Sequence, residues 1–201
     1  MTRIAMVAGE ASSDQLAAHL ISALRKHLPD AEFCGIGGPK MQREGFESLW
    51  PAEMLAVHGY AEALRNYRAI ARMRRQLLRR LLADRPDVFI GVDGYDFNLW
   101  LEHRLKRAGI ATIHYVSPSI WAWRRYRLRK IIGSVSHILA LYPFEPELYK
   151  GTGVKCSYVG HPMADVIPLG IDQDHAREKL GVAPGRPVVA LLPGSRQSEL
   201  H

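Results

Sequence analysis

The feature that most constrains this chain is an alternation of short apolar runs, rich in β-branched residues, with longer segments of helical periodicity. Such runs are typical of strands, which we predict at residues 4–8, 32–36, 88–92, 112–116, 137–141, 157–159 and 188–192. Helical patterns lie between them at 15–27, 64–82, 99–108 and 174–180. Several runs are apolar throughout, as expected where helices cover both faces of a parallel sheet. The sequence therefore predicts an α/β fold with a doubly wound, Rossmann-like parallel sheet.

The charge of the chain favours anionic partners. Twenty-seven Lys and Arg against 20 Asp and Glu give a net charge of +7, and arginines are dense between 65 and 85. Nucleic acid, an acidic membrane surface and phosphorylated substrates all suit this balance. In the helical segment 64–82, apolar residues recur at 64, 67, 70, 71, 77, 78, 81 and 82. We expect these to face the core and the arginines to face solvent.

Other features concern compartment and domain organisation. No apolar run approaches the roughly 18 residues of a membrane-spanning helix, and no secretory signal is recognisable, so we expect a cytoplasmic protein. Cys34 and Cys156 lack metal-ligand spacing, and we expect neither a metal nor a cofactor. The stretch 160–170 is rich in Pro and Gly. It predicts one domain over 1–170, followed by a linker and the first strand of a second domain over 171–201.

The loops that follow the predicted strands are the candidate sites, because ligands of doubly wound folds bind at the carboxyl ends of the strands. After 4–8 come Glu10 and Ser12, beside a helix N-terminus that can face an anion or a sugar hydroxyl. The simpler interpretation is a helix cap by Ser12, Ser13 or Asp14.

Asp93, Asp96 and Asn98 crowd the end of the 88–92 strand. A carboxylate held there can accept a proton from a substrate hydroxyl. The alternative is an aspartate that caps the next helix, which accounts for one acid more easily than for both.

The remaining loops offer partners for phosphate. After 112–116, Ser117, Trp123 and Arg124 combine a hydroxyl, a flat apolar surface and a cation, although paired tryptophans are more often core residues. His161 follows 157–159, where a lone histidine is usually structural. After 188–192, the residues Gly194, Ser195 and Arg196 suit a diphosphate.

Taken together, these stretches resemble the lipid-A-disaccharide synthase family. WAWR (121–124) and VGHPMAD (159–165) are the specific motifs. They occur in the family's order with VAGEASSD (7–14), GIGGPKM (35–41), PDVFIGVDGYDFN (86–98), IHYVSPSIWAWR (113–124), YPFEPELY (142–149) and LLPGSR (191–196).

The resemblance implies the N-terminal, acceptor-side half of a two-domain glycosyltransferase-B fold. It implies an inverting, metal-independent transfer of 2,3-diacylglucosamine from its UDP carrier to the 6-hydroxyl of 2,3-diacylglucosamine 1-phosphate, in lipid A biosynthesis. It also implies peripheral attachment to the anionic inner face of the inner membrane. The half-length chain by itself is then expected to be inactive.

Carried over by motif, Asp93 is the general base, and Gly194, Ser195 and Arg196 bind the nucleotide. Glu10, Ser12, Asp96, Asn98, Ser117, Trp123, Arg124 and His161 are expected to line the substrate cleft. Ser13 stands where the family usually has glycine, which predicts strain if that position needs a positive φ.

The same resemblance gives the basic helical segment a membrane-facing role, through Tyr60, Leu64 and Tyr67 beside Arg65 and Arg68. An ordinary solvated helix face is the alternative.

Rival functions remain. A truncated lipid-binding remnant would keep the family's ancestry without its catalysis. A basic nucleic-acid-binding module would explain the charge, but the sequence has no recognition-helix or stacking-sheet motif. A nicotinamide-dependent oxidoreductase lacks its glycine fingerprint here.

Overall fold

The structure is a computed structural model that describes residues 1–55, 59–120 and 127–192; the side chains of 53 and 59–66 are not described. The chain divides into two compact units, Met1–Gly160 and His161–His201.

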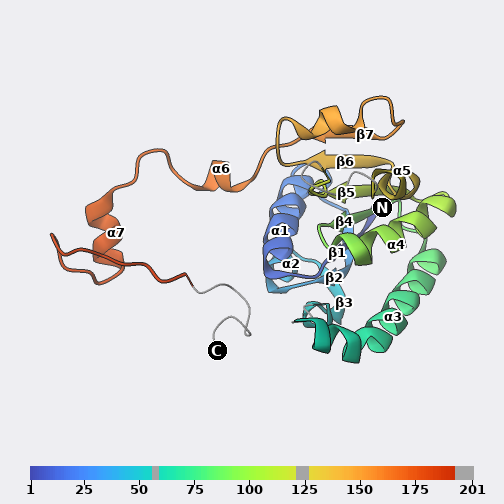
Figure 1. The fold of residues 1–201 in the computed structure, drawn as a ribbon, viewed down its shortest axis with the longest axis horizontal. Coiled ribbons are helices and arrows are strands. Elements are labelled where there is room, and N and C mark those ends of the chain that lie inside the picture. Colours follow the sequence, from blue (N-terminus) through green and yellow to red (C-terminus); the bar gives the residue numbers. More distant parts are fainter. Residues whose placement is uncertain (56–58, 121–126, 193–201) are drawn as a thin grey trace. The chain divides into compact units, whose positions relative to one another are not determined.

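The first unit contains a parallel seven-stranded sheet in the order β3-β2-β1-β4-β5-β6-β7 (Figure 1). The strands are β1 (Arg3–Ala8), β2 (Glu32–Gly37), β3 (Glu47–Pro51), β4 (Val88–Val92), β5 (Ala111–Tyr115), β6 (His137–Ala140) and β7 (Lys155–Tyr158). The order runs outward in one direction from β1 to β3 and in the other from β4 to β7. The predicted doubly wound parallel sheet is confirmed.

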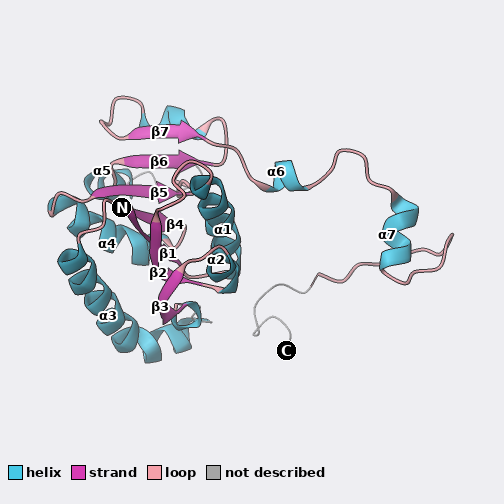
Figure 2. Cartoon of the chain, turned by 180° about the vertical axis from the view of Figure 1, so that it is seen from behind, coloured by secondary structure: helices cyan, strands magenta, loops and turns pink. Residues whose placement is uncertain are grey.

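Helices cover both faces of this sheet (Figures 1 and 2). On one face lie α1 (Ala11–Arg25) and α2 (Pro39–Arg43). On the other lie α3 (Gly59–Asp84), α4 (Tyr95–Arg107) and α5 (Leu128–Ser134). Short 3-10 turns, η1 (Ala52–Met54) and η3 (Glu145–Tyr149), complete the unit.

The central strand β1 shows why its sequence is apolar throughout. Ile4, Met6 and Ala8 belong to the core beneath α1. The alternate residues Ala5 and Val7 pack in the opposite core with side chains of α3 and α4. Because successive side chains of a strand point to opposite faces, a strand between two helical layers needs apolar residues at every position.

The predicted strands are found, within a residue or two, except the last. Residues 188–192 form no strand, and the side chains of Val189, Leu191 and Leu192 are 86%, 88% and 91% exposed. Strand pairing supplies hydrogen bonds and burial that a single apolar run cannot supply for itself, and the structure pairs this run with no described strand.

The edge strand β3 was not predicted, because its sequence is short, begins with Glu47 and ends at Pro51. It pairs with β2 through a register shift between Gly35 and Ile36. Gly35 has φ +138, and a Cβ there would lie 2.1 Å from the carbonyl oxygen of Met6, so only glycine fits.

The buried row of α3 also differs from the predicted one. Met73, Leu77 and Leu81 are buried against the sheet, one turn apart from each other. Tyr67 and Leu82, expected in the core, are 63% and 38% exposed. Among the described side chains of α3, from 67 to 84, fewer apolar residues are buried against the sheet than the sequence predicted.

Over residues 161–192, the second unit contains two short helices, α6 (Met163–Val166) and α7 (Gln173–Lys179). The Asp172 carboxylate accepts a hydrogen bond of 3.0 Å from the backbone of His175 and so caps α7. Large apolar side chains such as Leu169, Ile171 and Leu180 are exposed in this unit. Over the described residues, no helix has the length and apolar character required to span a bilayer.

Neighbouring leucines of α3 test this packing. We expect Leu81→Ala to lower the free energy of unfolding by about 2–5 kcal/mol, because it leaves a cavity between α3 and the sheet. Leu82→Ala, which removes the same atoms from an exposed position, should change it far less. Urea unfolding of both variants measures the difference, and equal losses would contradict the assigned helix face.

Candidate functional site

The candidate site lies along the carboxyl ends of three adjacent strands. β1 pairs with β4, and β4 pairs with β5, all in parallel register. The loops after these strands therefore emerge at one edge of the sheet. Glu10 lies after β1, with Ser12 in the first turn of α1. Asp93 follows β4, and Ser117 lies in the loop after β5.

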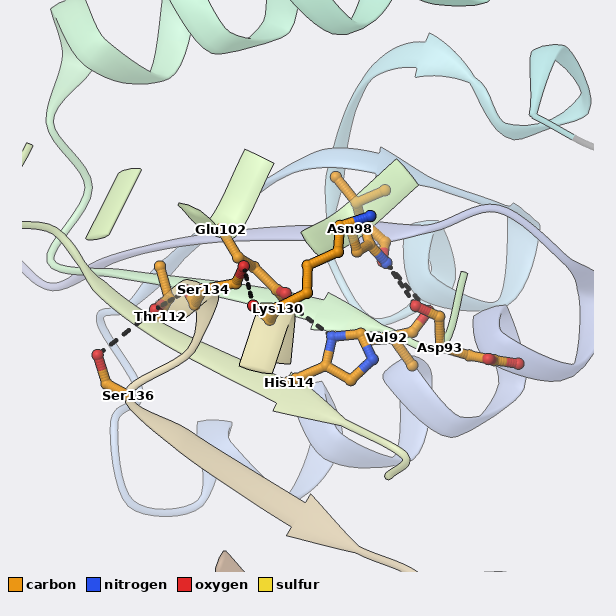
Figure 3. A network of polar contacts seen from close by, with 10 residues as sticks. Val92, Asp93, Asn98, Glu102, Thr112, His114, Lys130, Ser134 and Ser136 are labelled. Atoms are coloured by element: carbon orange, nitrogen blue, oxygen red, sulfur yellow. Dashed lines mark hydrogen bonds and ion pairs between the residues drawn. The ribbon is translucent and has the colours of Figure 1, made fainter. Parts of the chain in front are cut away.

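Asp93 is held rigidly at the end of β4. Its φ is +53, in the left-handed region that few residues other than glycine adopt, and Gly94 follows with the same φ. Its backbone N–H donates to the carbonyl of Tyr115 (2.9 Å), and its own carbonyl accepts from the side-chain amide of Asn98 (2.8 Å; Figure 3). Asp93 is exposed, so a fixed backbone presents a carboxylate to solvent at the strand end.

Asn98 is a buried clamp. Only 1% exposed, it also directs its Nδ2 to the carbonyls of Val7 (3.3 Å) and Val92 (3.4 Å). One amide group thus joins the ends of β1 and β4 to the loop of Asp93. The structure places Asn98 beneath the site, whereas Asp96, in the first turn of α4, is exposed.

The first loop combines exposed and structural residues. Glu10 and Ser12 are exposed, but Ser13 is buried. The Ser13 hydroxyl donates to the carbonyl of Glu10 (2.9 Å) and accepts from its N–H (3.0 Å), which closes the first turn of α1. Ser13 lies inside the helix and has no positive φ, so the condition under which strain was expected there is not met.

Asp14 lies in α1, but its side chain caps the N-terminus of α2. Its buried carboxylate accepts hydrogen bonds from the backbone N–H groups of Gly38 (2.9 Å), Lys40 (3.0 Å) and Met41 (3.1 Å), at the start of α2. The sequence indicated a local cap on α1. The partner loop is distant in sequence, and only the pairing of β1 with β2 brings it near.

Ser117 lies in the interior. It is 4% exposed, and its hydroxyl is 2.9 Å from the hydroxyl of Tyr149. Burial raises the pKa of Tyr149 to about 12, against the opposing effect of the Ser117 hydrogen bond. Val116 before it has φ +81, which is unusual for a β-branched residue. Both β4 and β5 are therefore followed directly by a non-glycine residue with a positive φ.

The other expected site residues do not belong to the described part of the first unit. Trp123, Arg124, Gly194, Ser195 and Arg196 lie outside the described residues. His161 belongs to the second unit, where it is exposed and accepts a hydrogen bond from the backbone of Met163 at its Nδ1 (3.2 Å). In the described part of the chain, no three His, Cys, Asp or Glu residues are grouped to hold a metal ion.

A buried acid–base pair lies behind the site and was not predicted. Glu102 on α4 and His114 on β5 are 0% and 1% exposed, with Oε1 and Nδ1 2.7 Å apart (Figure 3). Burial raises the pKa of Glu102, and His114 opposes that effect. Burial lowers the pKa of His114, but the Glu102 carboxylate and its hydrogen bond, aided by Asp93, raise it overall. Helical periodicity gave no sign of this pair, since Glu102 resembles a surface residue of an amphipathic helix.

Gly91 leaves space for the Glu102–His114 pair, and replacing it tests how closely the two side chains pack against β4. A Cβ at Gly91, the residue beside His114 on β4, would lie 2.3 Å from Oε1 of Glu102 and 2.9 Å from Cβ of Asn98. We expect Gly91→Ala to displace both side chains and lower the free energy of unfolding by about 1–3 kcal/mol. Gly133→Ala, where only a His103 atom lies near, at 3.8 Å, is the control. Thermal unfolding measures both variants, and a Gly91→Ala protein as stable as the control would contradict this packing.

Comparison with known proteins identifies the relatives of this chain. The family described as lipid-A-disaccharide synthetase matches residues 4–201. The lipid-A-disaccharide synthase of Azoarcus sp. is 63% identical over 99% of this chain and 51% of its own length. Those of Dechloromonas aromatica and Neisseria meningitidis serogroup C are 62% and 56% identical, over 52% and 51% of their lengths.

Among solved structures, a Glycyrrhiza uralensis protein complexed with glycyrrhetinic acid 3-O-monoglucuronide aligns over 80% of this chain and 48% of its own, with a TM-score of 0.47 and 12% identity. The chain spans about half the length of the curated relatives it matches. The family match over nearly the whole sequence leads to one conclusion: this chain belongs to the lipid-A-disaccharide synthase family.

Proposed function

We propose that this chain is the acceptor-side half of a glycosyltransferase that makes lipid A disaccharide 1-phosphate. In the reaction, the 6-hydroxyl of 2,3-diacylglucosamine 1-phosphate attacks the anomeric carbon of UDP-2,3-diacylglucosamine, and UDP leaves. The observation that carries this proposal is Asp93, an exposed carboxylate on a rigid loop at the carboxyl end of a central parallel strand. Family membership supports the sugar and lipid chemistry.

Asp93 has the role of general base. A single inverting displacement needs one group to take the proton from the attacking hydroxyl as the new bond forms. The proton passes to the carboxylate, the glycosidic bond forms on the opposite face of the sugar, and the electrons of the broken bond leave with UDP. Asn98 and Tyr115 fix the backbone of Asp93, so the carboxylate needs little reorganisation to meet the hydroxyl.

The rest of the proposed site binds the sugar donor, UDP-2,3-diacylglucosamine. Gly194, Ser195 and Arg196 are proposed to bind its diphosphate, whose developing charge a cation and backbone N–H groups would stabilise. The exposed Glu10, Ser12 and Asp96 are proposed to contact the sugars, together with Trp123, Arg124 and His161. For Asn98 and Ser117, burial favours positioning roles over direct contact.

The base can be tested in a chimaera that joins residues 1–201 to the C-terminal half of the Azoarcus sp. relative. We expect Asp93→Asn to reduce UDP release by a factor of about 10²–10⁴, because the amide cannot accept the proton. Asp87→Asn is the matched control: Asp87 precedes the other end of β4, where its carboxylate accepts from the backbone of Arg3 (2.8 Å).

Loss of activity in both variants, or in neither, would contradict the assignment of Asp93. The 201-residue chain without the second half is expected to release no UDP. If this shorter chain binds 2,3-diacylglucosamine 1-phosphate while the chimaera is inactive, the lipid-binding remnant becomes the better account.

The membrane contact is proposed to involve a groove on α3. Arg68, Arg72, Arg75 and Arg79 line it, with Tyr67, Ala71 and Gln76, around a volume of about 410 Å³. All four arginines are exposed, and none pairs with a carboxylate among the described residues. Unneutralised cations in one row suit a surface of anionic headgroups. The side chains of Tyr60, Leu64 and Arg65, expected to share this role, lie outside the described part.

Binding to vesicles rich in phosphatidylglycerol tests this arginine groove. At about 1 kcal/mol for each basic residue, the double variant Arg72→Gln/Arg75→Gln should bind about thirtyfold more weakly. Arg43→Gln/Arg107→Gln removes the same charge from exposed positions on α2 and α4 and should bind almost normally. Equal weakening would mean that net charge alone attracts the chain. Tighter binding to a double-stranded oligonucleotide than to vesicles would favour the nucleic-acid alternative.

A further inference from the structure

Two cations at the start of α5 lie over the ring of one tyrosine of α4. Arg127 directly precedes α5, and its guanidinium carbon lies 4.7 Å from the ring centre of Tyr95. The ammonium nitrogen of Lys130 lies 5.4 Å from the same ring centre. Side chains three residues apart along a helix point to the same side. Because α5 packs against α4, both cations therefore reach the first turn of α4 from one side of α5.

Tyr95 connects this pair of cations to the proposed base. It is the first residue of α4, and only Gly94 separates it from Asp93. Two trans peptide bonds place the Cα atoms of Asp93 and Tyr95 at most about 7.6 Å apart. The carbonyl of Gly94 accepts from the N–H groups of Phe97 and Asn98 (both 3.0 Å), which fixes this segment in the first turn of the helix. The cations thus lie over the residue that follows the loop of Asp93.

The fold alone does not account for two like charges at one ring. Cations at neighbouring helical positions repel each other, and the face of an aromatic ring offsets only part of that repulsion. Lys130 is exposed and forms no ion pair with a carboxylate among the described residues. A bound anion would lower the repulsion, and side chains already held at a ring lose less freedom when they bind one.

A phosphate monoester is the anion that suits this pair and this place. A guanidinium donates parallel N–H groups to two phosphate oxygens, and an ammonium adds a compact positive charge. In the acceptor of the proposed reaction, the carbon that carries the phosphate and the carbon that carries the 6-hydroxymethyl group flank the ring oxygen of one sugar. An acceptor whose 6-hydroxyl meets Asp93 therefore has its phosphate within the width of one sugar ring from that carboxylate.

We propose that Arg127 and Lys130, held over Tyr95, bind the 1-phosphate of the acceptor. This inference rests on the proposed function, in which Asp93 takes the proton from the 6-hydroxyl of the same sugar. The sugar is then fixed at two points, by its phosphate on α5 and by its hydroxyl at the end of β4. Two fixed points orient the hydroxyl toward the carboxylate, which one contact cannot do.

The test compares 2,3-diacylglucosamine 1-phosphate with the same lipid lacking its phosphate, each presented to the 201-residue chain in micelles of a neutral detergent. The ratio of the two dissociation constants, here called the phosphate advantage, isolates the contribution of the phosphate. We expect a phosphate advantage of at least about tenfold. Lys130→Gln and Arg127→Gln should each remove most of it and leave binding of the lipid without phosphate unchanged, which a general structural defect would not do.

Two controls separate this site from a general effect of charge and from a membrane surface. Arg129→Gln removes the same charge from an exposed position of the same helix, next to Lys130, and should preserve the phosphate advantage. Arg129 contacts no aromatic ring in the described part of the chain. Vesicles of phosphatidylglycerol offer the other source of phosphate, a lipid headgroup, and Arg127→Gln/Lys130→Gln should bind them almost as tightly as the unsubstituted chain does.

The proposal is overturned if the unsubstituted chain binds the two lipids equally well, or binds neither. It is overturned equally if Arg129→Gln reduces the phosphate advantage as much as Lys130→Gln does, or if the double variant loses vesicle binding and keeps the phosphate advantage. Should Arg127→Gln fail to fold, the exposed Lys130 decides by itself.

Failure of the proposed function gives a different result. The chimaera would then be inactive, or insensitive to Asp93→Asn, while the phosphate advantage persists in the 201-residue chain. A chimaera whose activity depends on Asp93, together with a chain that shows no phosphate advantage, would refute the cation site alone.

Discussion

The pairing of β1 with β4 is the contact on which the rest of this structure depends. It joins two halves of a sheet whose strand order runs outward in opposite directions. The connections that leave β1 and β4 therefore diverge, with α1 on one face and α4 on the other (Figure 1). Where such connections part, side chains at the carboxyl ends of the strands are left accessible. Asp93 stands at that position.

The polar residues around this point are of two kinds: one is exposed to solvent, and the others are buried and hold it in place. Asp93 is exposed, but its carbonyl and N–H are held by Asn98 and by the carbonyl of Tyr115. Asn98 is itself buried and also reaches Val7 across the β1–β4 junction. A side chain that reacts with a substrate must be accessible to it. The groups that orient the reacting side chain are more effective when they are buried away from water and held in one geometry. The site is thus an accessible carboxylate on a buried hydrogen-bonded support.

Most strands of the sheet could be predicted from the sequence, and the errors in that prediction have physical causes. The strands around the centre of the sheet were predicted because both of their faces are buried, which makes their sequences apolar at every position. The edge strand β3 was missed, since an edge has less to bury and tolerates Pro51. The run 188–192 was predicted as a strand from the same apolar signal, yet strand formation also requires a partner.

The sequence by itself determined the fold class, the family and the candidate base. These follow from local features: apolar runs, helical periodicity, and motifs whose residues are contiguous. The tertiary structure decided which polar residues are buried and what they hold. Asp14 caps α2, Asn98 clamps Asp93, and Glu102 meets His114 across the space that Gly91 leaves. Such contacts join residues from separate elements, and the free energy of a buried polar group depends on partners that no local stretch of sequence contains.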